Sequence, residues 1–484
     1  MSKQINFQLD PAEYRHWKVE YQGSVARLIM DVDENGGLFD GYELKLNSYD
    51  LGVDIELADI VQRMRFEHPE VGAVVMQSGK EKFTNETRNT FEAAGSESGQ
   101  HYLAAVKGAC AGGGYELALA CDEIYMTDDG STSVALPEVP LLAVLPGTGG
   151  LTRVTDKRKV RRDLADVFCS IEEGIKGKRA KDWCLVDEVV ANSKFDEFVT
   201  SRASEIADRA KAGKDPKGIT LNPLERTFHE DGSVTYSSVE VELDRSGRVA
   251  TISIAGPADS APASVEELHS QGDQAWMLRT ARELDDAILH LRLNELEIGV
   301  VIFKTQGDPQ QVAEHEALIL ENNNSDWLYM MDGDFEEDNR PLATISLTEA
   351  NFGPFPMSND LSRLETRFLG APEKVGEAEA QIGQALEALD AEELGLVTFA
   401  YDDVDWEDEV RIFLEERASF SPDALTGMEA NLRFAGPETM ETRIFGRLTA
   451  WQNWIFQRPN AVGETGALQS YGTGKRGKYD MNRV

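Results

Sequence analysis

The sequence has few residues of the kinds that build metal sites or disulfide frameworks. Its four cysteines form no Cys-x-x-Cys pair, and its seven histidines show no His-Glu-x-x-His or similar ligand spacing. We therefore expect no zinc site. No signal-peptide-like apolar run opens the chain, and no stretch of about 18 apolar residues occurs within it. These absences predict a cytoplasmic protein with reduced thiols, neither secreted nor membrane-spanning.

Positive charge is also scarce. The chain carries 48 Lys and Arg residues against 86 Asp and Glu residues, a formal net charge of -38 at pH 7. Such a surface repels phosphate backbones and anionic lipid headgroups, so we expect neither nucleic acid nor membrane as a partner. The densest basic cluster is the run KRKVRR at residues 157–162. It is either a binding site for an anionic ligand or a solvated helix face, and its pattern leaves both open.

The sequence does contain the pattern of an α/β protein. Its 484 residues are 41% hydrophobic and 28% charged, which is typical of a globular chain long enough for two domains, or three with a helical tail. Residues 17–32 alternate like a strand hairpin, residues 54–66 have helical spacing, and residues 71–77 form an apolar, strand-like run. Further strands follow, separated by a glycine turn and a helix. This order predicts parallel strands with crossover helices.

The second half of the chain repeats this pattern. After a polar, basic stretch at residues 208–223, the order strand, strand, helix, strand returns. A later match places Glu349 opposite Glu138, and another pairs residues 390–410 with residues 178–199. We infer an internal duplication. Chance similarity between short α/β units is the alternative.

A glycine turn between an apolar strand and a helix is a candidate ligand site. The segment GACAGGGYELALACDE places Gly112, Gly113 and Gly114 at the start of the helix. Backbone N–H groups there can approach a ligand closely, and the helix dipole favours negative charge, so the turn can hold an oxyanion. Tight turns also use glycine for packing, so the run alone leaves both interpretations open. It fits neither a dinucleotide fingerprint, because Leu117 occupies the last glycine position, nor a P-loop.

Two glutamates are candidate acid-base groups. Glu116 lies two residues past Gly114, where the helix dipole favours a carboxylate, and its alternative role is an acid on a solvated face. Glu138 follows Pro137 in the apolar string SVALPEVPLLAVLPGTGGL. An acid in such surroundings is either functional or satisfied by backbone donors. The intervening residues suffice for a helix, a strand and a turn that bring the second carboxylate back beside the first.

Together these segments resemble a known family. The string AAVKGACAGGGYELALACDE, followed by LPEVPLLAVLPGTGGLTRV, is similar to the paired signature of the enoyl-CoA hydratase and isomerase (crotonase) superfamily. The resemblance covers about residues 17–199 and implies a crotonase-like ββα-repeat spiral fold. It also implies that the N–H of Gly113 binds a thioester carbonyl, and that Glu116 and Glu138 handle water and proton transfers.

The resemblance places further residues near the substrate. Gly112 and Gly114 belong to the glycine turn. Cys110 precedes the turn, where it either lines the pocket or is a buried structural thiol. Asn47 matches a family stretch near the coenzyme A nucleotide, and its alternative role is a loop-capping amide.

Coenzyme A is part of the substrate that the resemblance implies, so we expect no further cofactor. Its phosphates need local cations on so acidic a protein. Arg161 and Arg162 are our candidates, because guanidinium forks match phosphate oxygens. Pairing of these charges with Asp156 and Asp163 is the alternative. The family also suggests a homodimer.

Longer segments, among them KFTNETRN and RLTAWQNWIFQRPNAVGE, resemble a branch of the superfamily whose chains are much longer than ordinary hydratases. This implies ring opening of an epoxide-bearing CoA thioester with two waters, giving formate and an open-chain aldehyde acyl-CoA. We expect a crotonase-like catalytic domain at residues 1–225, a degenerate crotonase-like domain at residues 226–375, and a helical C-terminal region with an irregular tail at residues 376–484.

The sequence departs from the family pattern in two places. The loop that carries the family's first oxyanion donor has no counterpart between Lys82 and Phe83. The second half likewise passes from Leu347 to Thr348 without a counterpart of the glycine-turn helix. A true deletion after Lys82 would leave half an oxyanion hole. Three functions therefore remain open: the ring-opening enzyme, a simpler enoyl-CoA hydratase or isomerase, and a non-catalytic acyl-CoA-binding protein.

Overall fold

The computed structural model describes two compact units. It covers residues 4–39, 41, 43–44, 47, 49–80, 82–83, 99–211, 217–319, 329–331, 343–353, 356–357, 359–470 and 473–482. The units are Met1–Pro223 and Leu224–Val484. Their boundary lies close to the first predicted one, and the division of the rest into residues 226–375 and 376–484 stays a prediction. Within the described residues, no helix is long and apolar enough to cross a membrane.

The first unit is built on a six-stranded sheet with the order β1-β2-β3-β5-β7-β10. β1 and β2 form the expected antiparallel hairpin, and the other neighbours are parallel. The strands are β1 (Trp17–Gln22), β2 (Val25–Met30), β3 (Ala73–Ser78), β5 (His101–Val106), β7 (Glu123–Asp128) and β10 (Glu188–Ala191). The crossover pattern predicted from the sequence is therefore confirmed.

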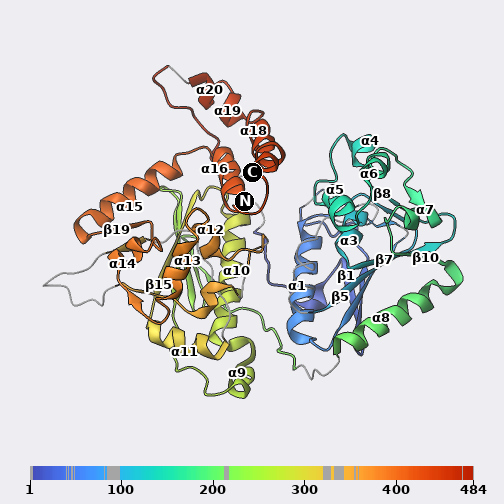
Figure 1. Ribbon diagram of the computed structural model, residues 1–484, viewed down its shortest axis with the longest axis horizontal. Coiled ribbons are helices and arrows are strands. Elements are labelled where there is room, and N and C mark those ends of the chain that lie inside the picture. Colours follow the sequence, from blue (N-terminus) through green and yellow to red (C-terminus); the bar gives the residue numbers. More distant parts are fainter. Residues whose placement is uncertain are drawn as a thin grey trace. The chain divides into compact units, whose positions relative to one another are not determined.

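Helices cover both faces of this sheet. α1 (Leu51–Glu67) begins where the Asp50 carboxylate accepts the N–H groups of Gly52 and Val53, and its apolar side packs on one face. α8 (Phe195–Lys211) packs on the other face (Figure 1). The remaining helices of the unit are α3 (Gly113–Ala120), α4 (Glu138–Leu142), α5 (Gly150–Thr152), α6 (Arg162–Phe168) and α7 (Gly177–Asp182).

A small second sheet extends from the carboxyl ends of the large one. Its order is β4-β6-β8-β9. The strands are β4 (Lys82–Phe83), β6 (Ala109–Ala111), β8 (Ser133–Ala135) and β9 (Ile175–Lys176). β6 leads into α3, and β8 leads into α4. Because β6 and β8 pair in parallel, the segments that follow them begin side by side.

The second unit repeats the opening of the first. β13 (Val239–Asp244) and β14 (Val249–Ala255) form a hairpin, and β15 (Val300–Gln306) adds in parallel, as β3 adds to β2. α10 (Trp276–Asn294) connects β14 to β15, as α1 connects β2 to β3. Two short strands, β11 (Thr227–Phe228) and β12 (Val234–Thr235), complete this sheet.

The same hydrogen bonds recur at matching positions of the two units. In the first, the buried Glu56 carboxylate of α1 accepts three backbone N–H groups at the start of β1, including that of Trp17. In the second, the buried Glu283 carboxylate of α10 accepts the N–H groups of Ser237 and Ser238, just before β13. In both units, a buried carboxylate on the helix therefore hydrogen-bonds the backbone at the start of the strand hairpin and holds the helix against it.

A tyrosine-aspartate pair lies one helical turn further along each helix. The Tyr14 hydroxyl donates to Asp59 in α1, and the Tyr236 hydroxyl donates to Asp286 in α10 at 2.8 Å. Desolvation and the neighbouring carboxylate raise the pKa of both tyrosines well above the ordinary value, so both remain donors. Chance similarity does not account for two repeated contacts of this kind, so the internal duplication stands on side-chain chemistry as well as on element order.

The second unit also repeats the later part of the first unit, and this repeat extends past residue 376. β17 (Ile345–Ser346) pairs antiparallel with β18 (Ala385–Leu386), as β8 pairs with β9. The order α14, β19, α15 then repeats α7, β10, α8, and β19 pairs in parallel with β16, as β10 does with β7. The elements are β16 (Tyr329–Met331), β19 (Phe399–Tyr401), α14 (Ala388–Glu393) and α15 (Asp403–Ala418). The range that we expected to be a helical region with an irregular tail therefore also includes the short strands β18 and β19.

The remaining elements of the second unit are helices. They are α9 (Val265–Gln271), α11 (Pro309–Ile319), α12 (Arg363–Arg367), α13 (Glu373–Glu379), α16 (Pro422–Leu432), α17 (Met440–Thr442), α18 (Thr449–Ile455), α19 (Pro459–Val462) and α20 (Ala467–Ser470). We expected an irregular tail from residue 461 onward. Residues 473–482 do lack regular structure, but α20 lies within that tail. Residues 473–482 are also held by hydrogen bonds to the rest of the unit. Asn460 exchanges two hydrogen bonds with the backbone of Asp480, and Arg248 donates to the carbonyl of Met481.

Candidate active site

The glycine turn forms the centre of the site. Gly112 has φ 59° and ψ -133°, a backbone conformation that residues with a Cβ rarely adopt. Its N–H donates to the carbonyl of Ala135 at 3.0 Å, which fixes the turn against the end of β8. The backbone conformation alone therefore requires glycine at this position, whether or not a ligand binds there.

Gly113 is the first residue of α3, so its N–H has no partner within the helix. The N–H belongs to the start of a helix, where the partial charge favours an anion or a polarised carbonyl. Gly114 is buried inside the first turn. The N–H of Gly112 already donates to Ala135, so Gly113 is the first residue of the turn whose N–H can be offered to a carbonyl, as the resemblance implies.

Glu116 is held by a loop from another part of the chain. Its side chain is buried, with 2% of the residue exposed. One carboxylate oxygen, Oε1, accepts the N–H of Gly150 at 2.7 Å, and the other, Oε2, accepts the Thr148 hydroxyl at 2.6 Å. Glu116 is therefore not an acid on a solvated face. No pattern in the sequence indicated that Thr148 would contact it.

Glu138 lies next to the same turn. It opens α4 and is 8% exposed. An ideal Cβ placed on Gly112 would lie 3.4 Å from Glu138 Oε1, so this carboxylate lies over the glycine. Cys169 is also near: burial, followed by the charges of Glu138 and Asp166, raises the pKa of its thiol to about 11. Sequence reasoning missed Cys169, which remains a neutral thiol at pH 7.

These residues form one constellation around a single turn. The Glu116 N–H donates to the carbonyl of Gly112, and the Glu138 carboxylate lies over the same residue. The helix-start N–H can polarise a carbonyl. Of the two buried glutamates beside it, one can take a proton while the other gives one. The structure thus brings together Gly113, Glu116 and Glu138 as the sequence predicted, and their catalytic roles stay predictions.

Two other predicted site residues have structural contacts instead. Cys110 is part of the buried core, and burial raises the pKa of its thiol well above the ordinary value. Asn47 is fully buried. Its amide accepts from the Val32 N–H and donates to the Met30 carbonyl and the Ser78 hydroxyl, so it ties the end of β2 to the end of β3. Both arrangements favour the structural alternatives that the sequence left open.

The basic run at residues 157–162 divides between structural and exposed side chains. Lys157 donates to the last carbonyl of α3, that of Ala120, at 2.8 Å. Arg158 pairs with Asp187, and the exposed Arg161 pairs with Asp163. Arg162 is exposed at the start of α6. Pairing of Arg161 with Asp163 is the alternative we considered, and contact with coenzyme A phosphates stays a prediction.

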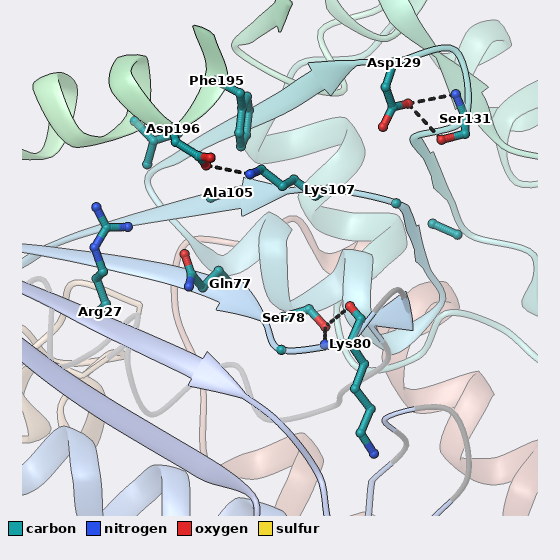
Figure 2. Close-up of a pocket in the computed structure, with 14 residues that line it drawn as sticks. Arg27, Gln77, Ser78, Lys80, Ala105, Lys107, Asp129, Ser131, Phe195 and Asp196 are labelled. Atoms are coloured by element: carbon teal, nitrogen blue, oxygen red, sulfur yellow. Dashed lines mark hydrogen bonds and ion pairs between the residues drawn. The ribbon is translucent and has the colours of Figure 1, made fainter. Parts of the chain in front are cut away.

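A cavity of about 1010 Å³ lies at the carboxyl ends of β3 and β5, on the face of the sheet covered by α8 (Figure 2). Its lining includes Lys107, which forms an ion pair with Asp196 at 2.6 Å, and Lys80, which donates to the Val32 carbonyl. Neither Glu116 nor Glu138 lines it. The charged groups Lys107, Asp196 and Lys80 in its lining have protein partners, and the cavity contains neither of the two glutamates proposed for catalysis.

The position after Lys82, where the family's donor loop has no counterpart in this sequence, lies in β4 beside the strand that leads into the turn. β4 pairs in parallel with β6, placing Phe83 opposite Cys110. Residues 84–98, where a second oxyanion donor would be sought, lie outside the described residues. Among the described residues, no group of three or more His, Cys, Asp or Glu side chains is arranged to hold a metal ion.

Residues 93–215, which contain the glycine turn and both glutamates, match the model of the enoyl-CoA hydratase/isomerase family. More particularly, the chain belongs to the benzoyl-CoA-dihydrodiol lyase family. It is 47% identical to benzoyl-CoA-dihydrodiol lyase from Aromatoleum evansii over 550 residues, covering 99% of this chain and 98% of the relative. The alignment is longer than this chain, so the relative has residues that this chain lacks.

More distant relatives match a smaller share of the chain. The fatty acid oxidation complex subunit alpha of Idiomarina loihiensis is 32% identical over 186 residues, which cover 38% of this chain and 25% of the relative. A solved enoyl-CoA hydratase from Bacillus anthracis is 25% identical, with a TM-score of 0.33, covering 40% of this chain and 77% of that one.

Glu349, the counterpart of Glu138, lacks the features of the active site. It opens a short 3-10 helix (Glu349–Phe352) and is exposed, whereas Glu138 is buried. We expect Glu349→Gln to retain turnover close to that of the unchanged protein, because the Glu349 side chain is exposed to solvent and its charge has no buried environment to act in. Steady-state kinetics check this. A loss as deep as that of Glu138→Gln, with the fold intact, would show that the second unit has an active site of its own.

Proposed function

We propose that this protein converts 2,3-epoxy-2,3-dihydrobenzoyl-CoA and two waters into 3,4-dehydroadipyl-CoA semialdehyde and formate, as a ring-opening carbon-carbon lyase. The observation that carries the proposal is the pair of buried glutamates beside the Gly112–Gly113 turn, in a chain that belongs to the benzoyl-CoA-dihydrodiol lyase family. An acid and a base beside one oxyanion donor suit a reaction in which water attacks while a ring oxygen is protonated.

The proposed mechanism uses the turn first. The thioester carbonyl accepts the Gly113 N–H, which stabilises enolate character as the ring bonds change. One of Glu116 and Glu138 then activates a water to attack the epoxide, and the other protonates the opening oxygen. The resulting diol loses the carbon-carbon bond between its two oxygen-bearing carbons, and the released electron pair is taken up through the diene by a proton, so that the ring opens to two aldehydes. A second water adds to the aldehyde carbon attached to the thioester α-carbon, and cleavage of the bond between these two carbons leaves the thioester enolate, which is protonated, and releases formate. Either glutamate can be the base in a given step.

The assay that tests this function is incubation with 2,3-epoxybenzoyl-CoA while formate is measured. We expect one formate per thioester consumed. Turnover of crotonyl-CoA without release of formate from the epoxide would instead favour an enoyl-CoA hydratase or isomerase. Binding of both thioesters with turnover of neither would favour a non-catalytic acyl-CoA-binding protein, for which the short connection after Lys82 is the supporting feature.

Other parts of the proposal concern the protein's surroundings. We propose a cytoplasmic homodimer that needs no cofactor besides the coenzyme A of its substrate. The large excess of acidic over basic residues supports a partner list without nucleic acid or membrane surfaces.

Arg161 and Arg162 are the proposed contacts for the coenzyme A phosphates. We expect the double change Arg161→Gln and Arg162→Gln to weaken binding of a full CoA thioester about 10-fold, because charge-assisted hydrogen bonds to phosphate are lost. Affinity for the pantetheine-truncated analogue, which lacks the nucleotide phosphates, should not change. Calorimetry with both ligands measures the difference.

A second pair of basic residues provides the control for overall charge. Lys178 and Arg179 are adjacent and exposed in α7. Changing both to Gln removes the same charge and should leave both affinities as they were. Equal weakening of both ligands by the Arg161 and Arg162 changes, or no weakening, would show that these residues only pair with neighbouring acids such as Asp163.

A further inference from the structure

The carboxylate of Glu116 is oriented by one short loop. Its two oxygens accept from two different donors, Gly150 N–H and Thr148 Oγ1, which lie two residues apart. A carboxylate held through one oxygen can still rotate about its last bond, whereas two contacts at separate oxygens fix its plane. The loop therefore determines the direction in which Glu116 presents its remaining lone pairs.

The two donors differ in what they contribute. The Gly150 contact comes from the backbone, and the position has no room for a side chain, since an ideal Cβ there would lie 2.8 Å from Glu116 Oε1 and 2.9 Å from its Cγ. The Thr148 contact comes from a side chain. It is thus the one of the two that a substitution can remove without disturbing the backbone.

The loop itself is anchored independently of the Thr148 hydroxyl. Arg153 donates from its guanidinium to the carbonyl of Thr148 at 3.2 Å, and from its backbone to the carbonyl of Gly149 at 2.9 Å. Pro146 is buried at the start of the loop. Thr148 as a residue is exposed, so removal of its methyl group should cost little packing. The contact that matters at this position is the hydrogen bond from its hydroxyl to Glu116.

We propose that Thr148 is a positioning residue for the reaction: its hydroxyl fixes the carboxylate of Glu116 in the orientation required for proton transfer. The proposal rests on the proposed function, because it acts through a glutamate of that site. Nothing in the mechanism above requires Thr148 to touch the substrate.

The test compares Thr148→Val, which keeps the shape without the donor, with Thr148→Ser, which keeps the donor without the methyl group. We expect Thr148→Val to lower kcat about 10-fold, the effect of one hydrogen bond to a charged group, with KM little changed. The pH profile of kcat/KM should also differ from that of the unchanged protein, because the carboxylate of Glu116 has lost a donor. Thr148→Ser should restore both quantities. Thr152→Val, an exposed threonine of the next turn, is the matched control.

The outcome can be separated from the proposed function. If the unchanged protein turns over crotonyl-CoA and not the epoxide, the same variants are compared on crotonyl-CoA, since Glu116 serves either reaction. If it turns over neither, the infrared carboxylate band that disappears in Glu116→Gln gives the readout. A shift of that band in Thr148→Val but not in Thr148→Ser supports the assignment. Unchanged kinetics on an active substrate, or an unchanged band, overturns it.

Discussion

Glu116→Gln and Glu138→Gln should each lower turnover of the epoxide thioester by at least about 100-fold, the magnitude typical of a lost general acid or base. Affinity for the CoA thioester should stay nearly the same. The reason is that glutamine keeps the shape of the carboxylate. At position 116 the amide oxygen can still accept the Gly150 N–H, and the amide nitrogen can donate to the Thr148 hydroxyl.

Formate release and thioester binding are measured on the same preparations, so loss of turnover is not confused with loss of fold. The double variant should be little worse than either single one, because the two groups act on one reaction sequence. Activity close to that of the unchanged protein in either single variant would remove that glutamate from the mechanism and leave the other as the only acid-base group of the pair.

Much of the first unit can be predicted from local sequence. The hairpin, α1 and β3 follow from apolar periodicity, and the parallel pairing of β6 with β8 follows from the order of strands and helices between Gly112 and Glu138. The approach of the two glutamates is a consequence of that pairing. It was therefore open to prediction without knowledge of any side-chain contact.

Contacts between distant segments could not be predicted in this way. Thr148 reaches Glu116 across 32 residues, and no pattern in either segment announces the other. Arg158 finds Asp187, and Asn47 finds the ends of two strands, through the packing of the whole unit. Such partners depend on the path that each loop takes through the folded unit. The periodicity of apolar residues does not specify that path.

The second unit shows the same limit. Its hairpin and helix were visible as a repeat, but β18 and β19 are only two and three residues long, too short to give a strand pattern within a segment rich in helix formers. The repeated tyrosine-aspartate and glutamate-backbone contacts are visible only once α10 is placed on its sheet. They indicate that the duplication preserved the fastening of the hairpin, while Glu349 lost the burial that distinguishes Glu138.

Gly112→Ala should combine a loss of stability with a loss of turnover. Its φ of 59° with ψ of -133° costs a residue with a Cβ of the order of 1–3 kcal/mol. Space is not the obstacle, because the nearest atom to the new Cβ would be Glu138 Oε1 at 3.4 Å. The backbone should instead relax toward negative φ. That relaxation rotates the peptide between Gly112 and Gly113, and with it the N–H proposed to bind the thioester carbonyl.

Misdirection of one oxyanion donor lowers kcat by about 100-fold or more, so turnover should fall well beyond the loss of folded protein. Gly23→Ala is the matched control, because Gly23 also has a left-handed φ, 62°, in the β1–β2 hairpin, and a Cβ there would meet nothing within 4 Å. Denaturant unfolding should show a penalty in both variants, and formate release should fall only in Gly112→Ala. Undiminished kcat in a folded Gly112→Ala protein would contradict the role of this turn, because a donor whose orientation does not matter is not stabilising the transition state.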